Sequence, residues 1–79
     1  MKVKIISVTD FNGNPKDEWI WGKERTFLYS PMIGYSMILE DLELEKTRIT
    51  SVLEAIQDGL DTQKQYYTLN SIYTLEEME

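Results

Sequence analysis

The last third of this chain constrains the fold more than any other part, because it holds two β-prone runs separated by a polar link. Residues 49–57, ITSVLEAIQ, are rich in β-branched and apolar side chains. Residues 66–76, YYTLNSIYTLE, continue with aromatic, threonine and aliphatic side chains, which favour strands. Asn70-Ser71 interrupts the second run and suits a tight turn, since both side chains can bond nearby backbone. The segment predicts the closing hairpin of a small β-barrel.

The chain has 79 residues, a length that predicts one domain over 1–79. It contains no Cys and no His, which excludes disulfides, thiol catalysis, Cys/His zinc sites and histidine acid–base chemistry. A carboxylate-only site for Mg²⁺ or Ca²⁺ stays open, but the spacing of an EF-hand calcium loop is absent. We therefore expect no cofactor, and the lack of Cys fits a reducing cytoplasm.

The charge is uneven along the chain. The formal net charge of −6 comes from the second half, because the residues up to Met37 carry a small positive excess and those from Ile38 onward are strongly acidic. A negative domain disfavours a nucleic-acid backbone, which needs clustered Lys and Arg. The excess of negative charge suits solubility or docking onto a basic protein surface.

The N-terminal residues resemble the start of a signal peptide, but Ser7, Thr9 and Asp10 break the apolar run. No stretch approaches the roughly 20 apolar residues of a membrane-spanning helix. We expect no membrane insertion and a cytoplasmic location.

Residues 2–9 predict a strand whose apolar residues change face. Val3 and Ile5 share one face, whereas Ile6 and Val8 take the other. This shift predicts a β-bulge, or burial on both faces, near Ile5-Ile6.

Turn and strand patterns then alternate. Asn12-Gly13-Asn14-Pro15 predicts a turn, residues 26–29 and 35–39 predict strands, and the acidic residues 40–48 predict an exposed loop or strand end. Residues 47–60 are ambiguous, because the apolar positions have helical spacing while the composition favours a strand, which we prefer.

The closing segment predicts strands at 65–69 and 72–76, followed by a frayed tail at 76–79. Five short strands, a long early excursion over 10–26 and a one-turn break at Asn70-Ser71 together look like an SH3-like barrel. The expected fold class is therefore all-β, a small five-stranded SH3-like barrel, with room for one short helical turn.

The patterns T50-S-V-L-E-A-I and T68-L-N-S-I-Y-T-L resemble small proteins encoded by bacteriophages and other bacterial mobile elements. The resemblance covers about the last thirty residues. It implies a fold but no chemistry, since a small barrel hosts many functions. Small acidic phage proteins of this size commonly bind and inhibit a host protein, so the resemblance implies that role.

Trp19 and Trp21 are the first candidate functional residues. In a strand, their i, i+2 spacing would place both indoles on one face. One alternative is that they pack in the barrel core or cover one end of the barrel. The other is that they line a binding surface near the long first loop. The ALYDY-like segment of peptide-binding SH3 domains is missing, which disfavours polyproline ligands.

The tyrosines form a second set, in which Tyr35 is the candidate for partner binding. If 66–69 is a strand, Tyr66 and Tyr67 face opposite ways, so one of them is exposed. Base stacking would need basic residues alongside, and only Lys64 is near.

Residues 40–45 form the densest acidic run. The alternatives are a solvated loop and an electrostatic docking patch that matches Arg or Lys on a partner. A catalytic carboxylate pair is disfavoured, and the serines have neither a histidine base nor Ser–Lys motif spacing.

These observations predict a non-enzymatic protein-binding module, a phage-encoded inhibitor or modulator of an unidentified bacterial host protein, acting as a monomer or small homo-oligomer. The alternative is a structural or accessory virion component that oligomerises through its edge strands. The predicted partner-binding residues are Trp19, Trp21, Tyr35, Glu40, Asp41, Glu43 and Glu45.

Overall fold

The computed structural model describes residues 1–41, 43 and 46–78, and it confirms the all-β class. The described residues form six strands and one short 3₁₀ helix: β1 (Lys2–Thr9), η1 (Glu18–Ile20), β2 (Glu24–Phe27), β3 (Ser36–Asp41), β4 (Lys46–Asp58), β5 (Gln63–Thr68) and β6 (Ile72–Met78).

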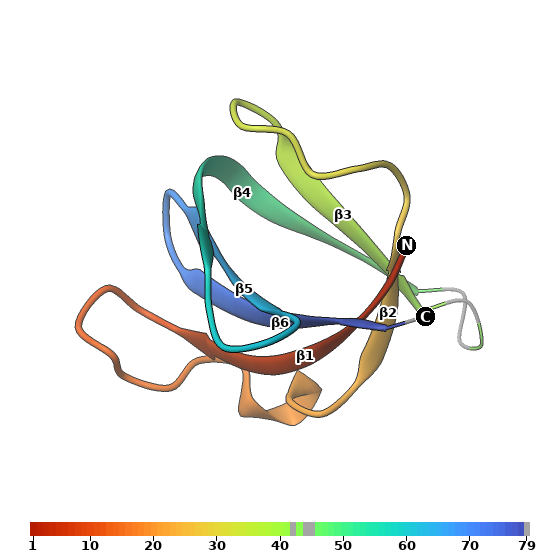
Figure 1. The fold of residues 1–79 in the computed structure, drawn as a ribbon, viewed down its shortest axis with the longest axis horizontal. Coiled ribbons are helices and arrows are strands. Elements are labelled where there is room, and N and C mark those ends of the chain that lie inside the picture. Colours follow the sequence, from red (N-terminus) through yellow and green to blue (C-terminus); the bar gives the residue numbers. More distant parts are fainter. Residues whose placement is uncertain (42, 44–45, 79) are drawn as a thin grey trace.

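The six strands pair antiparallel in sequence order, and β1 pairs with both β2 and β6, so that the sheet closes on itself (Figure 1). The predicted count of five strands is wrong. The strands predicted at 65–69 and 72–76 are confirmed as β5 and β6, with Asn70-Ser71 in the tight turn between them. β5 and β6 pair from Gln63 opposite Glu76 to Tyr67 opposite Ile72.

The predicted bulge in β1 is confirmed. The register between β1 and β6 shifts between Ile5 and Ser7, so one extra residue is inserted on the β1 side. As a result Val3, Ile5 and Val8 are all fully buried, although strict alternation would place Val8 on the opposite face from the other two. The bulge lets one strand contribute three side chains to a single core.

The predicted turn at residues 12–15 is also confirmed. The Asp10 carboxylate accepts hydrogen bonds from the backbone amides of Asn12 and Asn14 at 2.8 and 2.9 Å. Gly13 has a φ of 84°, a conformation that glycine adopts without steric cost. The bonds from Asn14, first among several, lower the pKa of Asp10 below its ordinary value, because they favour the charged carboxylate.

Residues 46–58 form a continuous strand, which confirms the strand interpretation of this ambiguous segment. β4 is long enough to pair with β3 through its first half and with β5 through its second half. Each half of β4 is therefore paired along one edge, and this pairing overrides the helical spacing of its apolar residues.

The predicted fraying of residues 76–78 is wrong. β6 continues to Met78, where Glu77 pairs with Val3 and Met78 pairs with Lys2. The first strand of the chain supplies the backbone partners that an isolated acidic tail would lack. Glu79 lies outside the described residues.

The core fills the inside of the closed sheet. Every strand contributes at least one buried apolar side chain, and η1 contributes Ile20 across one end. The buried apolar residues are Val3, Ile5, Val8, Ile20, Phe27, Met37, Leu39, Leu53, Tyr66, Tyr73 and Leu75. The ring of Phe27 contacts that of Tyr66 with centroids 6.0 Å apart, a tilted arrangement favoured by aromatic pairs.

Candidate functional site

The two tryptophans are separated by the 3₁₀ helix, which corrects their predicted placement on one face of a strand. Residues 18–20 coil into η1, so the two side chains leave the backbone in different directions. Trp19 is 71% exposed. Trp21 packs against the core instead, and its indole Nε1 donates a hydrogen bond to the carbonyl oxygen of Lys16 at 3.0 Å.

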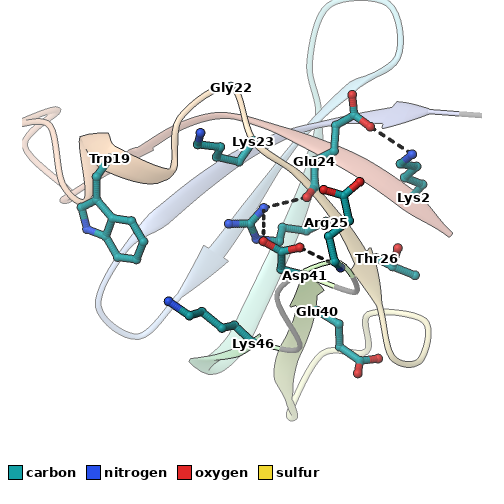
Figure 2. A pocket seen from close by; sticks show the side chains of 11 residues that line it. Lys2, Trp19, Gly22, Lys23, Glu24, Arg25, Thr26, Glu40, Asp41 and Lys46 are labelled. Atoms are coloured by element: carbon teal, nitrogen blue, oxygen red, sulfur yellow. Dashed lines mark hydrogen bonds and ion pairs between the residues drawn. The ribbon is translucent and has the colours of Figure 1, made fainter.

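Trp19 borders an open groove of about 900 Å³, which we call the Trp19 groove (Figure 2). The groove is formed by η1 and the following turn, by β2, and by the facing ends of β3 and β4. Its lining residues are Lys2, Trp19, Gly22, Lys23, Glu24, Arg25, Thr26, Glu40, Asp41, Glu43 and Lys46. The fold therefore brings Trp19 together with three of the acidic residues that the sequence analysis selected.

The acidic residues of the groove have different environments. Asp41 pairs with Arg25 at 3.6 Å, and both side chains are only 15% exposed. Its carboxylate also accepts the backbone amide of Glu43 at 3.1 Å. Glu40 lies half-buried one residue earlier in β3, and neighbours in a strand point to opposite faces. Glu45, the remaining predicted site residue, lies outside the described part of the chain.

The charges of the groove are balanced, although the second half of the chain is acidic. Four basic and four acidic side chains line it. Its middle is neutralised by the Arg25–Asp41 pair, and Lys2 pairs with Glu24 at 3.0 Å. Figure 2 places Lys23 and Lys46 at the Trp19 end and Glu40 toward the other end. The Trp19 end is therefore the more positive of the two.

A second, smaller depression of about 430 Å³ adjoins the Trp19 groove and shares Trp19, Arg25 and Lys46 with it. Its lining also includes Ile20 and Leu39 of the core, together with Ile49 on β4. Trp19 thus lines both depressions.

The remaining predicted aromatic site residue, Tyr35, is not in the Trp19 groove. It lies in the connection between β2 and β3, where its carbonyl oxygen accepts the backbone amide of Leu53 at 2.9 Å, and its side chain is exposed. Tyr66 and Tyr67 do face opposite ways, as predicted. Tyr66 is buried, whereas the hydroxyl of Tyr67 lies within hydrogen-bond distance of Gln57 and Gln65.

Arg48 is a residue of the site that the sequence analysis missed. Its guanidinium forms an ion pair with Asp17, the residue before η1, and donates hydrogen bonds to the Tyr73 hydroxyl at 3.2 and 3.3 Å. Burial alone would lower the pKa of Arg48, but Tyr73 and Asp17 outweigh this effect and raise it. No local pattern marks Arg48, because its partners lie far away in the sequence.

Lys16 makes the second contact that the sequence did not reveal. Its ammonium donates a hydrogen bond to Ser71 Oγ at 2.6 Å and to the carbonyl oxygen of Asn70 at 3.2 Å. A Lys beside a Ser is one arrangement used for nucleophilic catalysis. Here Ser71 is only 5% exposed, so a substrate carbonyl cannot reach its Oγ. The contact holds the first connection against the β5–β6 turn.

Comparisons with known proteins leave the site to be interpreted from its own geometry. No protein-family model matches the chain, and neither curated proteins nor solved structures give a match. Within residues 1–41, 43 and 46–78, no group of three acidic side chains is placed to hold a metal ion. No helix in this same part of the chain is both long and apolar enough to span a bilayer.

Proposed function

We propose that this protein is a non-enzymatic protein-binding module that contacts its partner through Trp19 and the groove beside it. The observation that carries the proposal is the position of Trp19, a large exposed aromatic side chain that lines two adjoining depressions. Tryptophan is among the residues most enriched in binding hot spots, because its burial on association contributes a large area.

The support for Trp19 is rigid. On one side of η1, Asp17 is paired with Arg48 of β4. On the other side, Trp21 packs on the core and its Nε1 binds the backbone of Lys16. Both ends of the short helix are therefore fixed to the sheet. Because the backbone that carries Trp19 is held in this way, a partner that covers Trp19 does not have to order that segment.

The charges around Trp19 indicate the chemistry of the partner. Among the described residues, neither Lys23 nor Lys46 has an ion-pair partner, and both lie at the Trp19 end of the groove. Glu40 lies toward the other end. The surface best complements a protein segment that has an apolar pocket for the indole, an acidic side chain near the two lysines and a basic one near Glu40. Such a charge pattern orients the partner more than it strengthens binding.

The more specific role, inhibition of a bacterial host protein by a phage-encoded domain, stays a prediction from the sequence resemblance. So does the SH3-like assignment, which is supported by the closed antiparallel sheet but not by the strand count. The virion alternative is less favoured in its edge-strand form, because each of the six strands has a strand neighbour on both sides and only the two halves of β4 are each paired along a single edge.

The test is capture of a partner from bacterial lysate by the tagged chain and by Trp19→Ala, followed by titration with the purified partner. We expect Trp19→Ala to weaken binding by about 2 kcal/mol, roughly 30-fold. The matched control is Phe11→Ala, which removes an aromatic ring that is 57% exposed outside the groove. If both folded variants bind as well as the original chain, the partner does not use the Trp19 groove.

A further inference from the structure

A second surface of the molecule is apolar and carries no charge. It lies over β3, the first half of β4 and the two connections beside them, and we call it the apolar face. Its exposed side chains are Leu28, Tyr29, Met32, Ile33, Tyr35, Ile49, Val52 and Leu69. None of them lines the Trp19 groove.

Backbone contacts show that the parts of the apolar face are neighbours. The amide of Leu28 donates to the carbonyl of Ile38 at 3.0 Å, and the amide of Gly34 donates to that of Leu53 at 2.8 Å. The amide of Leu69 donates to the carbonyl of Val52 at 3.1 Å. In Figure 1 the connection between β2 and β3 runs back beside β3 and ends next to β4. These bonds place the three segments that carry the eight side chains side by side.

The composition of these segments is unusual for an outer surface. Residues 26–39, 49–53 and 65–75 contain no Asp, Glu, Lys or Arg, although the whole chain has a net charge of −6. On β3 and β4, Ile38 is paired with Ile49, and the next pair is Ser36 with Val52. The outer face of an antiparallel sheet in contact with water is normally polar. An apolar outer face indicates that another surface covers it.

The size of the face is that of a protein interface. Together the eight side chains expose on the order of 700 Å², which exceeds the roughly 300–600 Å² of the largest apolar patch on a typical monomer. It is close to the area of about 800 Å² that each partner buries in a stable interface of standard size. The face alone is therefore large enough for a specific contact.

We propose that the apolar face is the interface of a two-fold homodimer, in which two copies of this chain cover each other. Two chains with a net charge of −6 repel each other wherever their charged surfaces approach. They can meet through the charge-free face without bringing like charges into contact. The face also offers no charged side chain that would select a different partner. A two-fold axis brings the same face of both copies together, so the apolar side chains of one copy are buried against those of the other.

The dimer does not depend on the proposed function, since none of its eight side chains lines the Trp19 groove and only Ile49 also lines the smaller depression beside Trp19. It would present two grooves on one particle, so that a partner with two binding sites would be held by avidity.

The experiment measures mass by sedimentation equilibrium from about 1 to about 100 μM chain, a range that covers micromolar dissociation constants. The original chain is expected to reach twice its mass of 9.3 kDa. Ile33→Glu places a charge at a side chain that is 62% exposed in a loop, where the fold tolerates it. We expect it to weaken the dimer at least tenfold. Leu69→Glu, on a separate segment, should do the same.

The matched control is Leu60→Glu, which adds the same charge at a leucine that is 80% exposed in the connection between β4 and β5. This variant should dimerise like the original chain. The proposal is overturned if the original chain is monomeric throughout, which would leave the face to a different protein. It is also overturned if the two face variants dimerise as tightly as the control, or if the mass exceeds that of a dimer.

Discussion

The Trp19 groove and the apolar face are built from overlapping strands, but they differ in the way they meet water. The groove has four basic and four acidic side chains and one exposed indole, whereas the apolar face has no charged residue over three segments. The charges of the groove can orient and select a partner. The charge-free face can instead stabilise a contact by burying apolar surface. The two surfaces are therefore suited to different contacts, the first to a selected partner and the second to a constitutive one.

The largest effect should come from removing the support beneath the groove. Trp21→Ala deletes a side chain that packs on the core and is expected to lower the free energy of unfolding by about 3 kcal/mol. Trp19→Ala removes an exposed ring and should leave the unfolding free energy within about 0.5 kcal/mol of its original value. Urea unfolding followed by circular dichroism measures both. Equal stability of the two variants would contradict the different roles assigned to them.

A smaller effect should follow from releasing one end of η1. Arg48→Leu removes the ion pair with Asp17 and the hydrogen bonds to Tyr73, and leaves Asp17 without its cation. We expect a loss of about 2 kcal/mol in unfolding free energy and faster amide exchange at residues 18–22. The dimer should persist at concentrations where the variant is folded. If η1 exchanges as slowly as before, Arg48 does not fix the groove.

Salt and charge reversal should separate the two surfaces. Lys23→Glu with Lys46→Glu is expected to weaken partner binding by about 1 kcal/mol, because both lysines stand beside Trp19. Added salt should weaken binding to the groove and leave the dimer unchanged or stronger, since apolar contacts are not screened. Reversal of Glu40 and Glu43 to Lys tests the acidic end in the same titration. Binding that is indifferent to salt and to both reversals would show that these charges are only solvated.

Alkaline pH should lower the free energy of unfolding through Tyr66 in the core. This effect should not depend on the Trp19 groove or on the apolar face. Burial raises the pKa of Tyr66, so the folded state favours the neutral phenol. The resulting stability is fully present below the ordinary tyrosine pKa of about 10 and is lost as the pH rises through the higher folded value. Tyr66→Phe should reduce this alkaline loss in unfolding measurements, whereas the control Tyr67→Phe, at a hydroxyl that is not buried, should retain it.

The local patterns predicted much of the fold. The bulge near Ile5, the turn at residues 12–15 and the strand at 46–58 follow from side-chain spacing and turn chemistry, which act over a few residues. The failures had long-range causes. The tail at 76–78 is ordered by pairing with β1, and six strands rather than five are needed for the pairing of β1 with β6 that closes the sheet.

The site was predicted in part for the same reason. Exposed aromatic and acidic residues can be selected from sequence, and Trp19, Glu40, Asp41 and Glu43 do lie on one groove. Their neighbours could not be foreseen, because Arg25 meets Asp41 and Arg48 meets Asp17 only after the sheet has closed. The balance of charge in the groove depends on these distant pairs rather than on the charge of each half of the chain.

The pairing of β1 with β6 determines when the domain can fold during synthesis. Lys2 lies opposite Met78, so the last contacts of the sheet join the two ends of the described chain. While the ribosome still holds β6, β1 lacks one of its two neighbours, and core residues such as Tyr73 and Leu75 are missing. Such non-local pairing slows folding. The domain can complete its fold only after β6 has emerged from the ribosome and can pair with β1.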